Sequence, residues 1–210
     1  MNHFFALEVP EEVRQDLTEQ VNRWRLEIDK ILRKEGFQSY DWARSCDYHI
    51  TLKFLGDISE TAIERAVDAA RAVAETNRPF KVRLAPAGSF RKSRMANAVL
   101  WMGVRHTLEI EELAYALNDS VTDPNLLAQM SRPGSVSQQY KPHITVARGV
   151  FEVERLGYRM TYEQPFPSWQ ADHFVLMQTL PPGKRANGAK ARYNTVRTFP
   201  FRKKPISDVS

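Results

Sequence analysis

The chain has 210 residues, of which 42% are hydrophobic and 26% are charged, a balance typical of a globular domain and not of a disordered or fibrous protein. It contains no run of about 18 apolar residues, which excludes a transmembrane helix, and its N-terminus does not resemble a secretory signal. A single cysteine, Cys46, excludes an internal disulfide, so we expect a cytoplasmic protein.

The net charge of +5 is concentrated near the C-terminus. Residues 181–210 contain eight Lys or Arg and one acid, whereas the first 180 residues are slightly acidic. A local excess of positive charge attracts polyanions such as RNA. For the basic C-terminal tail, residues 202–210, a solubilising role explains the charge equally well.

Apolar patterning in the N-terminal half predicts strands alternating with helices. Residues 4–9 read as a strand, and apolar residues at three- and four-residue steps from Val13 to Ile31 indicate an amphipathic helix. A second strand covers about residues 49–55. Ser59 is then placed to accept a hydrogen bond at the start of a second helix, which we expect to end before Pro79.

The C-terminal half shows a similar order. Strands are expected at about residues 80–84, 98–104, 143–149, 173–177 and 193–197, with one helix at about 108–121. The basic stretch 91–94 lies between the first two of these strands, where it either contacts a substrate or forms a solvated hairpin tip. Strand–helix–strand on each side of residue 100 or so suggests two related α+β lobes, each an antiparallel sheet with helices on one face.

One tetrapeptide occurs twice, 94 residues apart: His49-Ile50-Thr51-Leu52 and His143-Ile144-Thr145-Val146. Both copies alternate as strands do, and residues two apart in a strand point to the same face. Each copy therefore presents one imidazole and one hydroxyl side by side. We expect the two strands to face one another across a cleft and to hold a phosphate between the two histidines.

Two histidines that flank one phosphorus atom can divide general acid and general base catalysis. Free imidazole titrates near pH ~6.5, so that a neutral ring can take a proton from water while a protonated ring gives one to the leaving oxygen. The hydroxyls of Thr51 and Thr145 can donate to the non-bridging oxygens as charge develops there. A lone His in a strand is usually structural, but the repeat of the same neighbours favours catalysis.

Other kinds of site are not found in the sequence. It contains no His-Glu-x-x-His, Cys-x-x-Cys or Gly-x-Ser-x-Gly pattern, so we expect neither a metal nor a cofactor. Residues 183–190 resemble a phosphate-binding loop, but the lysine is one place late and the next segment is a strand. This segment is therefore interpreted as a basic loop near the cleft.

Together, these motifs resemble the 2H phosphoesterase superfamily, and within it the RNA 2′,3′-cyclic phosphodiesterases, also called 2′-5′ RNA ligases (ThpR/LigT-like). Residues 4–10 are similar to the opening strand of that family, and residues 48–57 and 141–148 are similar to its two His-x-Thr motifs. The second of these includes a proline before the histidine and an arginine five residues after it. Tyr193, followed by residues 199–201, is similar to the final strand.

The resemblance implies an α+β fold in which two pseudo-symmetric antiparallel-sheet lobes carry helices on their outer faces and enclose a central cleft. Both lobes would belong to a single domain covering residues 1–210. It also implies opening of an RNA 2′,3′-cyclic phosphate to a 2′-phosphate, without a metal, and a slow reversible 2′-5′ ligation. The expected partner is RNA with such ends, and we expect a monomer.

Five site residues follow from the resemblance: His49 and His143 as the acid–base pair, Thr51 and Thr145 as phosphate-oxygen donors, and Arg148 as a phosphate contact. We expect His49 to protonate the ribose 3′-oxygen and His143 to activate water. In a regular strand Arg148 falls on the face opposite the histidines, so its role requires a bulge or a strand end.

Two alternative functions are compatible with the same residues. The site could act on 2′-5′-linked oligonucleotides or on small cyclic nucleotides instead. The protein could also bind RNA or nucleotides without catalysis, through its basic C-terminal third.

Overall fold

The structure is a computed structural model that describes residues 1–93, 96–121, 140–149, 158–162, 165–181 and 191–202. The helices of this part are α1 (Glu11–Lys34), α2 (Glu60–Thr76) and α3 (Leu108–Ser120), with a short 3₁₀ turn, η1 (Ser45–Asp47). The strands are β1 (Asn2–Glu8), β2 (Asp41–Trp42), β3 (His49–Asp57), β4 (Phe80–Ser93), β5 (Ala96–Val104), β6 (His143–Gly149), β7 (Ser168–Ala171), β8 (His173–Thr179) and β9 (Tyr193–Pro200).

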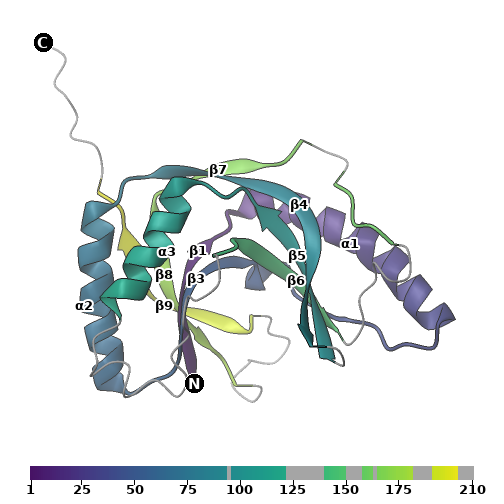
Figure 1. Ribbon diagram of the computed structural model, residues 1–210, viewed down its shortest axis with the longest axis horizontal. Helices are drawn as coiled ribbons and strands as arrows, with labels where there is room; N and C mark the ends of the chain where they lie inside the picture. The colour runs from purple at the N-terminus through teal and green to yellow at the C-terminus, as the bar shows by residue number, and fades with distance from the viewer. Residues whose placement is uncertain (94–95, 122–139, 150–157, 163–164, 182–190, 203–210) are drawn as a thin grey trace, which may run out of the picture.

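All nine strands belong to one sheet, and each pairing is antiparallel (Figure 1). The order is β7-β4-β5-β6-β3-β1-β8-β9, and β2 pairs with β6 beside this path. The α+β architecture with an antiparallel sheet is therefore confirmed. The two His-x-Thr strands, β3 and β6, are neighbours in this sheet and do not face one another across a cleft as expected, because their backbones pair at Ile50 and Ile144.

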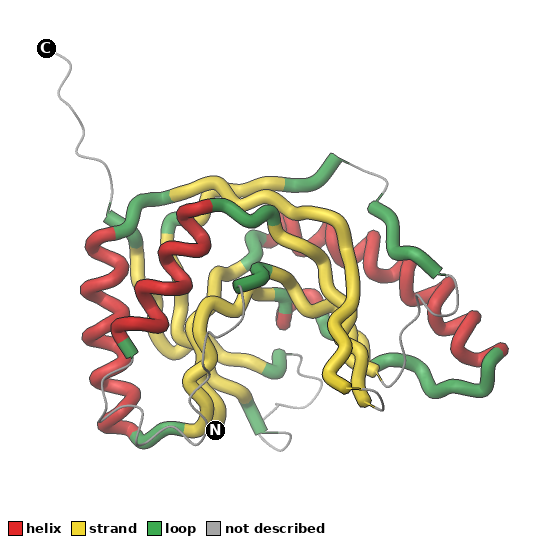
Figure 2. Tube along the Cα trace, in the orientation of Figure 1, coloured by secondary structure: helices red, strands yellow, loops and turns green. Residues whose placement is uncertain are grey.

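The helices cover the sheet in two groups (Figure 2). Helices α2 and α3 pack on each other and against the half made of β1, β3, β8 and β9, while α1 lies behind the half made of β4 to β6. Apolar residues of all three helices join the main core. No helix in the described ranges is both long and apolar enough to cross a membrane.

Strand β1 shows how the sheet divides its two faces. Phe5 and Leu7 point into the main core under the helices. Phe4 and Ala6 point the other way, into a smaller apolar cluster that includes Val175 of β8. Because side chains alternate along a strand, the sheet has one helix-covered face and one face without helices over this cluster.

Several local predictions are confirmed. The stripe on α1 is buried at Val13, Leu17, Val21, Trp24 and Ile28, and the helix buries Leu32 in its last turn where Ile31 was expected. Ser59 Oγ accepts a hydrogen bond from the backbone N–H of Ala62 at 3.2 Å, which satisfies one of the free donors at the start of α2.

Other local predictions were wrong or cannot be compared. Strand β4 continues through Ser93, because the β4–β5 ladder extends to the Ser93–Ala96 pair, so residues 91–93 are strand and not a loop. Strand β7 was not predicted from its short sequence. Arg94, residues 183–190 and the tail from 203 lie outside the described residues.

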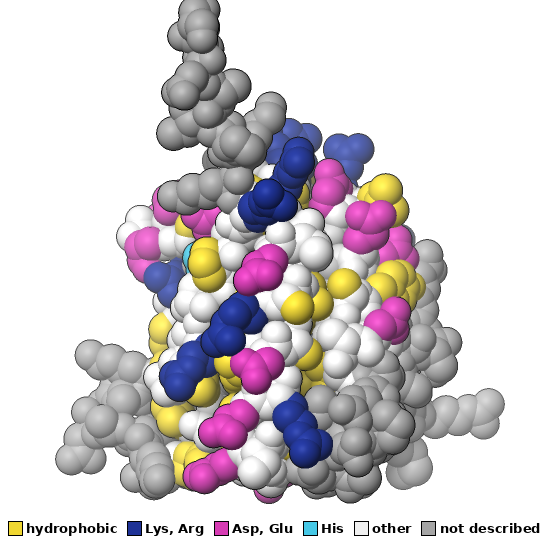
Figure 3. All heavy atoms as spheres, turned by 90° about the vertical axis from the view of Figure 1, so that its left-hand side faces the viewer, with side chains coloured by type: hydrophobic (Ala, Val, Ile, Leu, Met, Phe, Trp, Pro, Cys, Tyr) yellow, Lys and Arg dark blue, Asp and Glu magenta, His cyan; other side chains and the backbone are white. Residues whose placement is uncertain are grey.

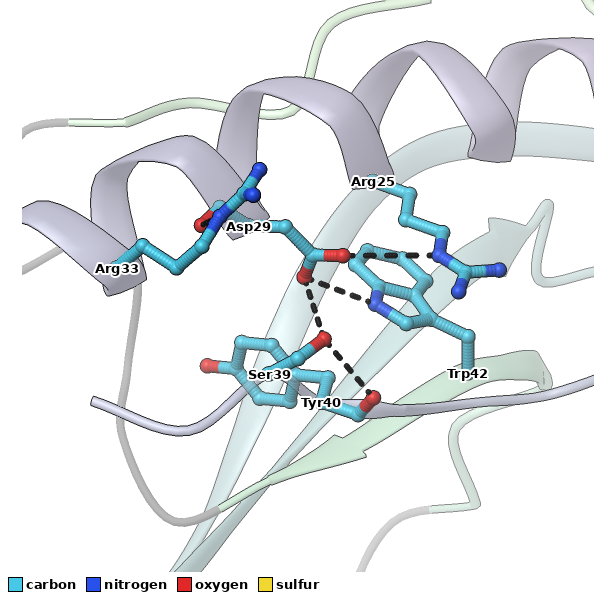
Figure 4. A network of polar contacts seen from close by, with 6 residues as sticks. All are labelled: Arg25, Asp29, Arg33, Ser39, Tyr40 and Trp42. Atoms are coloured by element: carbon cyan, nitrogen blue, oxygen red, sulfur yellow. Dashed lines mark hydrogen bonds and ion pairs between the residues drawn. The ribbon is translucent and has the colours of Figure 1, made fainter.

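The segment that leads into β2 is attached to α1 by one carboxylate, Asp29 (Figure 4). Asp29 Oδ1 accepts hydrogen bonds from Ser39 Oγ at 2.6 Å and from Trp42 Nε1 at 3.3 Å. Its Oδ2 lies 3.6 Å from Arg25 Nε, one turn earlier on the helix. Asp29 therefore fixes the position of β2 along the edge of β6.

The side of the molecule where α2 lies carries charges of both signs. Figure 3 shows basic and acidic side chains interspersed with hydrophobic ones across this surface. Arg71 and Asp68, for example, form an exposed pair at 3.0 Å on α2. Interspersed charges cancel at a distance, so this face gives no strong attraction for a polyanion.

Candidate active site

The two His-x-Thr motifs meet at the centre of the sheet. Ile50 of β3 pairs with Ile144 of β6, and both side chains are completely buried on the helix-covered face. The flanking histidines and threonines therefore lie on the opposite face. The antiparallel register places His49 beside Thr145 across the junction.

The same register places the second pair of side chains together. Thr51 lies beside His143, so each histidine has the threonine of the other motif across the strand junction. The two rings are close enough for the charge of His143 to act on the pKa of His49. The structure thus brings together the four residues that the repeated motif predicted.

Both imidazoles are held by the same backbone contact. Nδ1 of His49 lies 2.8 Å from the carbonyl oxygen of Asp47, and Nδ1 of His143 lies 2.8 Å from that of Lys141. A carbonyl oxygen only accepts, so Nδ1 carries the hydrogen in each ring. Nε2 of each neutral ring is then the nitrogen that can take up a proton.

Aromatic rings surround each histidine. The centre of the His49 ring lies 4.8 Å from that of Phe4 and 4.9 Å from that of Tyr193. The His143 ring lies 4.8 Å from Phe90 and 6.3 Å from Trp101. These contacts restrict the rings and remove water from them.

The loss of water changes the acidity of both rings. The pKa of His49 is lowered to about 4, chiefly by burial and also by the nearby charges of Arg148 and His143, while the hydrogen bond to the Asp47 carbonyl opposes the change. Burial also lowers the pKa of His143. Without a ligand both rings are therefore neutral at pH 7, whereas the motif alone suggested the ordinary imidazole value.

Arg148 reaches the histidine face because of a β-bulge. In the β5–β6 ladder Trp101 pairs with Thr145 and Leu100 pairs with Ala147, so Val146 is an extra residue. The extra residue reverses the alternation, which leaves Ala147 buried and Arg148 exposed. The charge of Arg148 lowers the pKa of both His49 and His143, as expected for a cation beside both rings.

The first motif has the matching irregularity. In the β1–β3 ladder Ala6 pairs with Thr51 and Phe5 pairs with Lys53, so Leu52 is the extra residue. Each His-x-Thr segment is therefore followed at once by a bulge. This second bulge turns Lys53 toward the helices, where its Nζ donates to Asn118 Oδ1 of α3 at 2.6 Å.

A polar cluster behind His49 was not predicted. The backbone N–H of Arg192 donates to Asp47 Oδ1 at 2.5 Å, and the Arg192 guanidinium donates to Asp41 Oδ1 at 2.5 Å. Residues from η1, β2 and the start of β9 are thus joined around the carbonyl that holds His49. They are far apart in the sequence, and no motif links them.

The remaining candidates have structural partners. His106 lies 3.5 Å from Glu111, and His173 is hydrogen-bonded to Asp172 and Glu8. Burial raises the pKa of the Cys46 thiol, which disfavours the reactive thiolate. In the part of the chain that the structure describes, no three His, Cys, Asp or Glu side chains are grouped to hold a metal.

Comparison with known families gives a match to part of the chain. Residues 12–101 match the family model described as LigT like Phosphoesterase. This segment contains the first His-x-Thr motif, and the curated relatives and solved structures below agree with it. Over these residues the chain is similar to the LigT-like phosphoesterases.

The curated proteins that this chain resembles have one name in common, RNA 2′,3′-cyclic phosphodiesterase. The protein of Geobacillus stearothermophilus is 34% identical over 108 residues, which are 51% of this chain and 32% of that protein. The match thus spans about a third of that relative. The protein of Methanocaldococcus jannaschii is 23% identical over 151 residues, which are 72% of this chain and 73% of the other.

Solved structures share the fold of this chain over nearly its whole length. TT0787 of Thermus thermophilus superposes with a TM-score of 0.68 at 23% identity and covers 97% of this chain and 100% of its own. LigT of E. coli in its apo form superposes with a TM-score of 0.60 at 25% identity, covering 95% and 96%. LigT of E. coli has also been solved in complex with 3′-AMP.

Proposed function

We propose that this protein opens the 2′,3′-cyclic phosphate at the end of an RNA to a 2′-phosphate, without a metal. The observation that carries the proposal is the pair of imidazoles on one sheet face, each held through Nδ1 so that Nε2 is free. The names of the curated relatives support the same substrate. The chemistry needs one proton taken and one proton given, which two imidazoles can supply.

In the proposed reaction, water attacks the phosphorus atom and the bond between phosphorus and the ribose 3′-oxygen breaks. Nε2 of His143 takes the proton from water, and protonated Nε2 of His49 gives its proton to the 3′-oxygen. Each role is typically worth ~10²–10⁴-fold in rate. The phosphate remains on the 2′-oxygen, and the two rings have exchanged protonation states.

The low pKa of His49 sets a condition on this assignment. A ring with a pKa of about 4 is neutral when the site is empty, so His49 becomes an acid only after a substrate raises its pKa. The negative charge of a bound cyclic phosphate between the rings acts in that direction. Substrate binding and protonation are therefore coupled in the proposed mechanism.

The other side chains stabilise the charge that develops on the phosphate. The hydroxyls of Thr51 and Thr145 lie on the same face as the rings and can donate to the two non-bridging oxygens. Arg148, brought to this face by the bulge at Val146, supplies a positive charge beside them.

The deciding experiment is an assay on an oligonucleotide that ends in a 2′,3′-cyclic phosphate, in excess chelator. The proposal predicts turnover to a product that carries only a 2′-phosphate. Loss of activity on chelation, or a 3′-phosphate product, would contradict it. A panel of 2′-5′-linked oligonucleotides and small cyclic nucleotides identifies the preferred substrate.

Two other activities are tested with the same materials. Ligation is the same displacement with an alcohol as the nucleophile: the 5′-hydroxyl of a second RNA attacks phosphorus in place of water, the 3′-oxygen leaves as a hydroxyl, and a slow 2′-5′ linkage should form. RNA binding without catalysis would appear as tight binding that the double variant His49→Ala/His143→Ala leaves unchanged, with no product formed.

The same proposal includes the location of the enzyme in the cell and its oligomeric state. An RNA substrate and an exposed cysteine that forms no disulfide, Cys46, fit a reducing cytoplasm. All four motif residues come from one chain, so a monomer in which residues 1–210 form one domain suffices for the chemistry. Sedimentation at working concentration measures the oligomeric state.

A further inference from the structure

A cavity of about 390 Å³ lies beside the second histidine motif. Its lining includes Trp101, Gly103, Lys141 and Pro142. Gly103 is the strand partner of His143, and Trp101 is the strand partner of Thr145. The cavity therefore adjoins the face on which the proposed reaction takes place, and its volume is in the range of ligand pockets.

The cavity wall is connected to both motifs. The carbonyl of Lys141 accepts the hydrogen bond from Nδ1 of His143. Tyr140, which also lines the cavity, donates its phenolic hydrogen to the backbone carbonyl of Thr51 at 3.0 Å. A group that fills the cavity therefore lies beside the backbone that positions His143 and Thr51.

Two glycines shape this wall. A Cβ at Gly88 would lie 2.6 Å from the Trp101 ring, and a Cβ at Gly103 would lie 2.4 Å from the carbonyl oxygen of Pro86. Without side chains at these positions, the indole lies against β4 at Gly88, and the segment of β4 between Ala85 and Gly88, where the register shifts, approaches β5. The wall combines apolar side chains such as Ala85 and Pro86 with the polar side chain of Lys141.

Two hydrogen-bond donors of the wall are the indole N–H of Trp101 and the ammonium of Lys141, while His106, which also lines the cavity, lies 3.5 Å from Glu111. Trp101 is 8% exposed, and within the described residues its Nε1–H has no acceptor. Lys141 Nζ lies 4.8 Å from the centre of the Trp101 ring, where it covers an aromatic face. A buried donor without a partner is costly, so a ligand that offers an acceptor here is favoured.

We propose that this cavity holds the nucleobase of the nucleotide whose cyclic phosphate is opened, an inference that rests on the proposed function. The base enters along the Trp101 indole and displaces the Lys141 ammonium from the ring. The donors of Trp101 and Lys141 then face carbonyl oxygens of the base. Uracil and guanine offer such oxygens at the ring edge and adenine offers none, so uridine and guanosine ends are preferred over adenosine ends.

The test compares substrates with and without a base. Uridine and adenosine 2′,3′-cyclic phosphates are assayed beside methyl riboside 2′,3′-cyclic phosphate, which has the same reacting group and no base. For the unmodified enzyme we expect kcat/KM for the uridine substrate to exceed that of the base-free one by about 10-fold or more, the size of one stacked base. Equal values would overturn the proposal.

Ala85→Leu then fills the cavity. This variant should lower kcat/KM for the uridine substrate nearly to that of the base-free substrate, and it should leave kcat/KM for the base-free substrate unchanged. Ala69→Leu on α2 is the matched control, since Ala69 is similarly half-buried and lies on another element. If Ala85→Leu lowers kcat/KM equally for both substrates, or for neither, the cavity does not bind the base. Far-ultraviolet circular dichroism identifies a variant that is misfolded.

Trp101→Phe tests the donor. It keeps an aromatic surface and removes the N–H, so the preference for uridine over adenosine should fall by about 3- to 10-fold, the value of one hydrogen bond. An unchanged preference would refute the assigned role of the indole. Lys81→Gln, at an exposed site on β4, controls for Lys141→Gln, which should reduce the same preference.

Failure of this inference can be separated from failure of the proposed function. If the enzyme opens no cyclic phosphate, including the base-free one, the proposed function fails. Calorimetric titration with uridine 2′-monophosphate still tests the cavity. Weaker binding to Ala85→Leu than to Ala69→Leu supports the cavity, and equal binding refutes it.

Discussion

Ile50 and Ile144 are backbone partners at the junction of β3 and β6, and both are completely buried. A rotation of half a turn about this pair exchanges the two His-x-Thr segments, because antiparallel neighbours run in opposite directions. The rotation also exchanges the bulges at Leu52 and Val146. A phosphate above the pair would thus meet an imidazole and a hydroxyl from each side.

Replacing either histidine by alanine should reduce kcat on a 2′,3′-cyclic phosphate by about 10²–10⁴-fold, since each variant removes one proton transfer. We expect little loss of stability, because neither Nδ1 contact involves a charged partner. Steady-state kinetics and urea unfolding measure the two effects.

The choice of leaving group distinguishes the acid from the base. A 4-nitrophenyl nucleotide diester releases a phenolate that needs no proton, so His49→Ala should retain much more activity on it than on the cyclic phosphate. His143→Ala should lose both activities. The opposite pattern would reverse the roles assigned to the two rings.

The pH profile of kcat/KM should be a bell that is centred below pH 6.5. The profile of kcat/KM reports the pKa values of the free enzyme, and burial lowers the pKa of both rings, that of His49 to about 4. Arg148→Gln should move the profile to higher pH, since the arginine charge lowers both pKa values, and should reduce the rate. The control variant Arg71→Gln, on α2, should change neither the pH profile nor the rate. If the pH profile of Arg148→Gln does not move, the charge of Arg148 does not lie beside the two rings.

The sequence was sufficient for those features that depend on neighbours along the chain. The stripe from Val13 to Ile28 specified α1, the hydroxyl of Ser59 specified the start of α2, and the two tetrapeptides specified which side chains share a face. In each case the repeat of a helix or a strand fixes the geometry without reference to the rest of the molecule.

The features that the sequence missed depend on partners distant in the chain. The bulge at Val146 is defined by how β6 pairs with β5, which the sequence of β6 does not show. From the sequence we could therefore say only that Arg148 needs a bulge or a strand end to reach the histidine face. Phe90 and Trp101 reach His143 from strands more than 40 residues away. The lowered pKa of His49 follows from burial, which pattern reasoning does not measure.

Asp29→Ala should destabilise the protein by about 2 kcal/mol, because a carboxylate that accepts two hydrogen bonds is removed: the indole of Trp42 loses this acceptor, and Ser39 keeps only the longer contact of 3.4 Å to the Tyr40 carbonyl. Urea unfolding at pH 7 measures the change. Asp68→Ala removes an exposed ion pair with Arg71 and should cost at most about 0.5 kcal/mol. Equal costs would show that Asp29 does not hold the segment leading into β2.

The pair of His173 and Glu8 should make stability depend on pH above neutrality. Nδ1 of His173 lies 2.6 Å from Asp172 Oδ1 and Nε2 lies 3.1 Å from Glu8 Oε2, and these contacts raise the pKa of His173 to about 9. The folded protein therefore keeps a proton that the unfolded chain loses near pH 6.5. The stabilisation is complete below pH 6.5 and is lost as pH rises through about 9.

The measurement is the difference in the free energy of unfolding between the unmodified protein and His173→Gln. This difference should be largest at pH 6 and should shrink steadily between pH 6.5 and 9. Working with the difference cancels the opposite effect of His49, whose lowered pKa contributes stability above pH 6.5 that is lost as pH falls toward 4. His106→Gln, which removes a histidine with one carboxylate at 3.5 Å, serves as the control. A difference for His173→Gln that stays constant from pH 6 to 9 would show that the imidazolium is not held by Glu8 and Asp172.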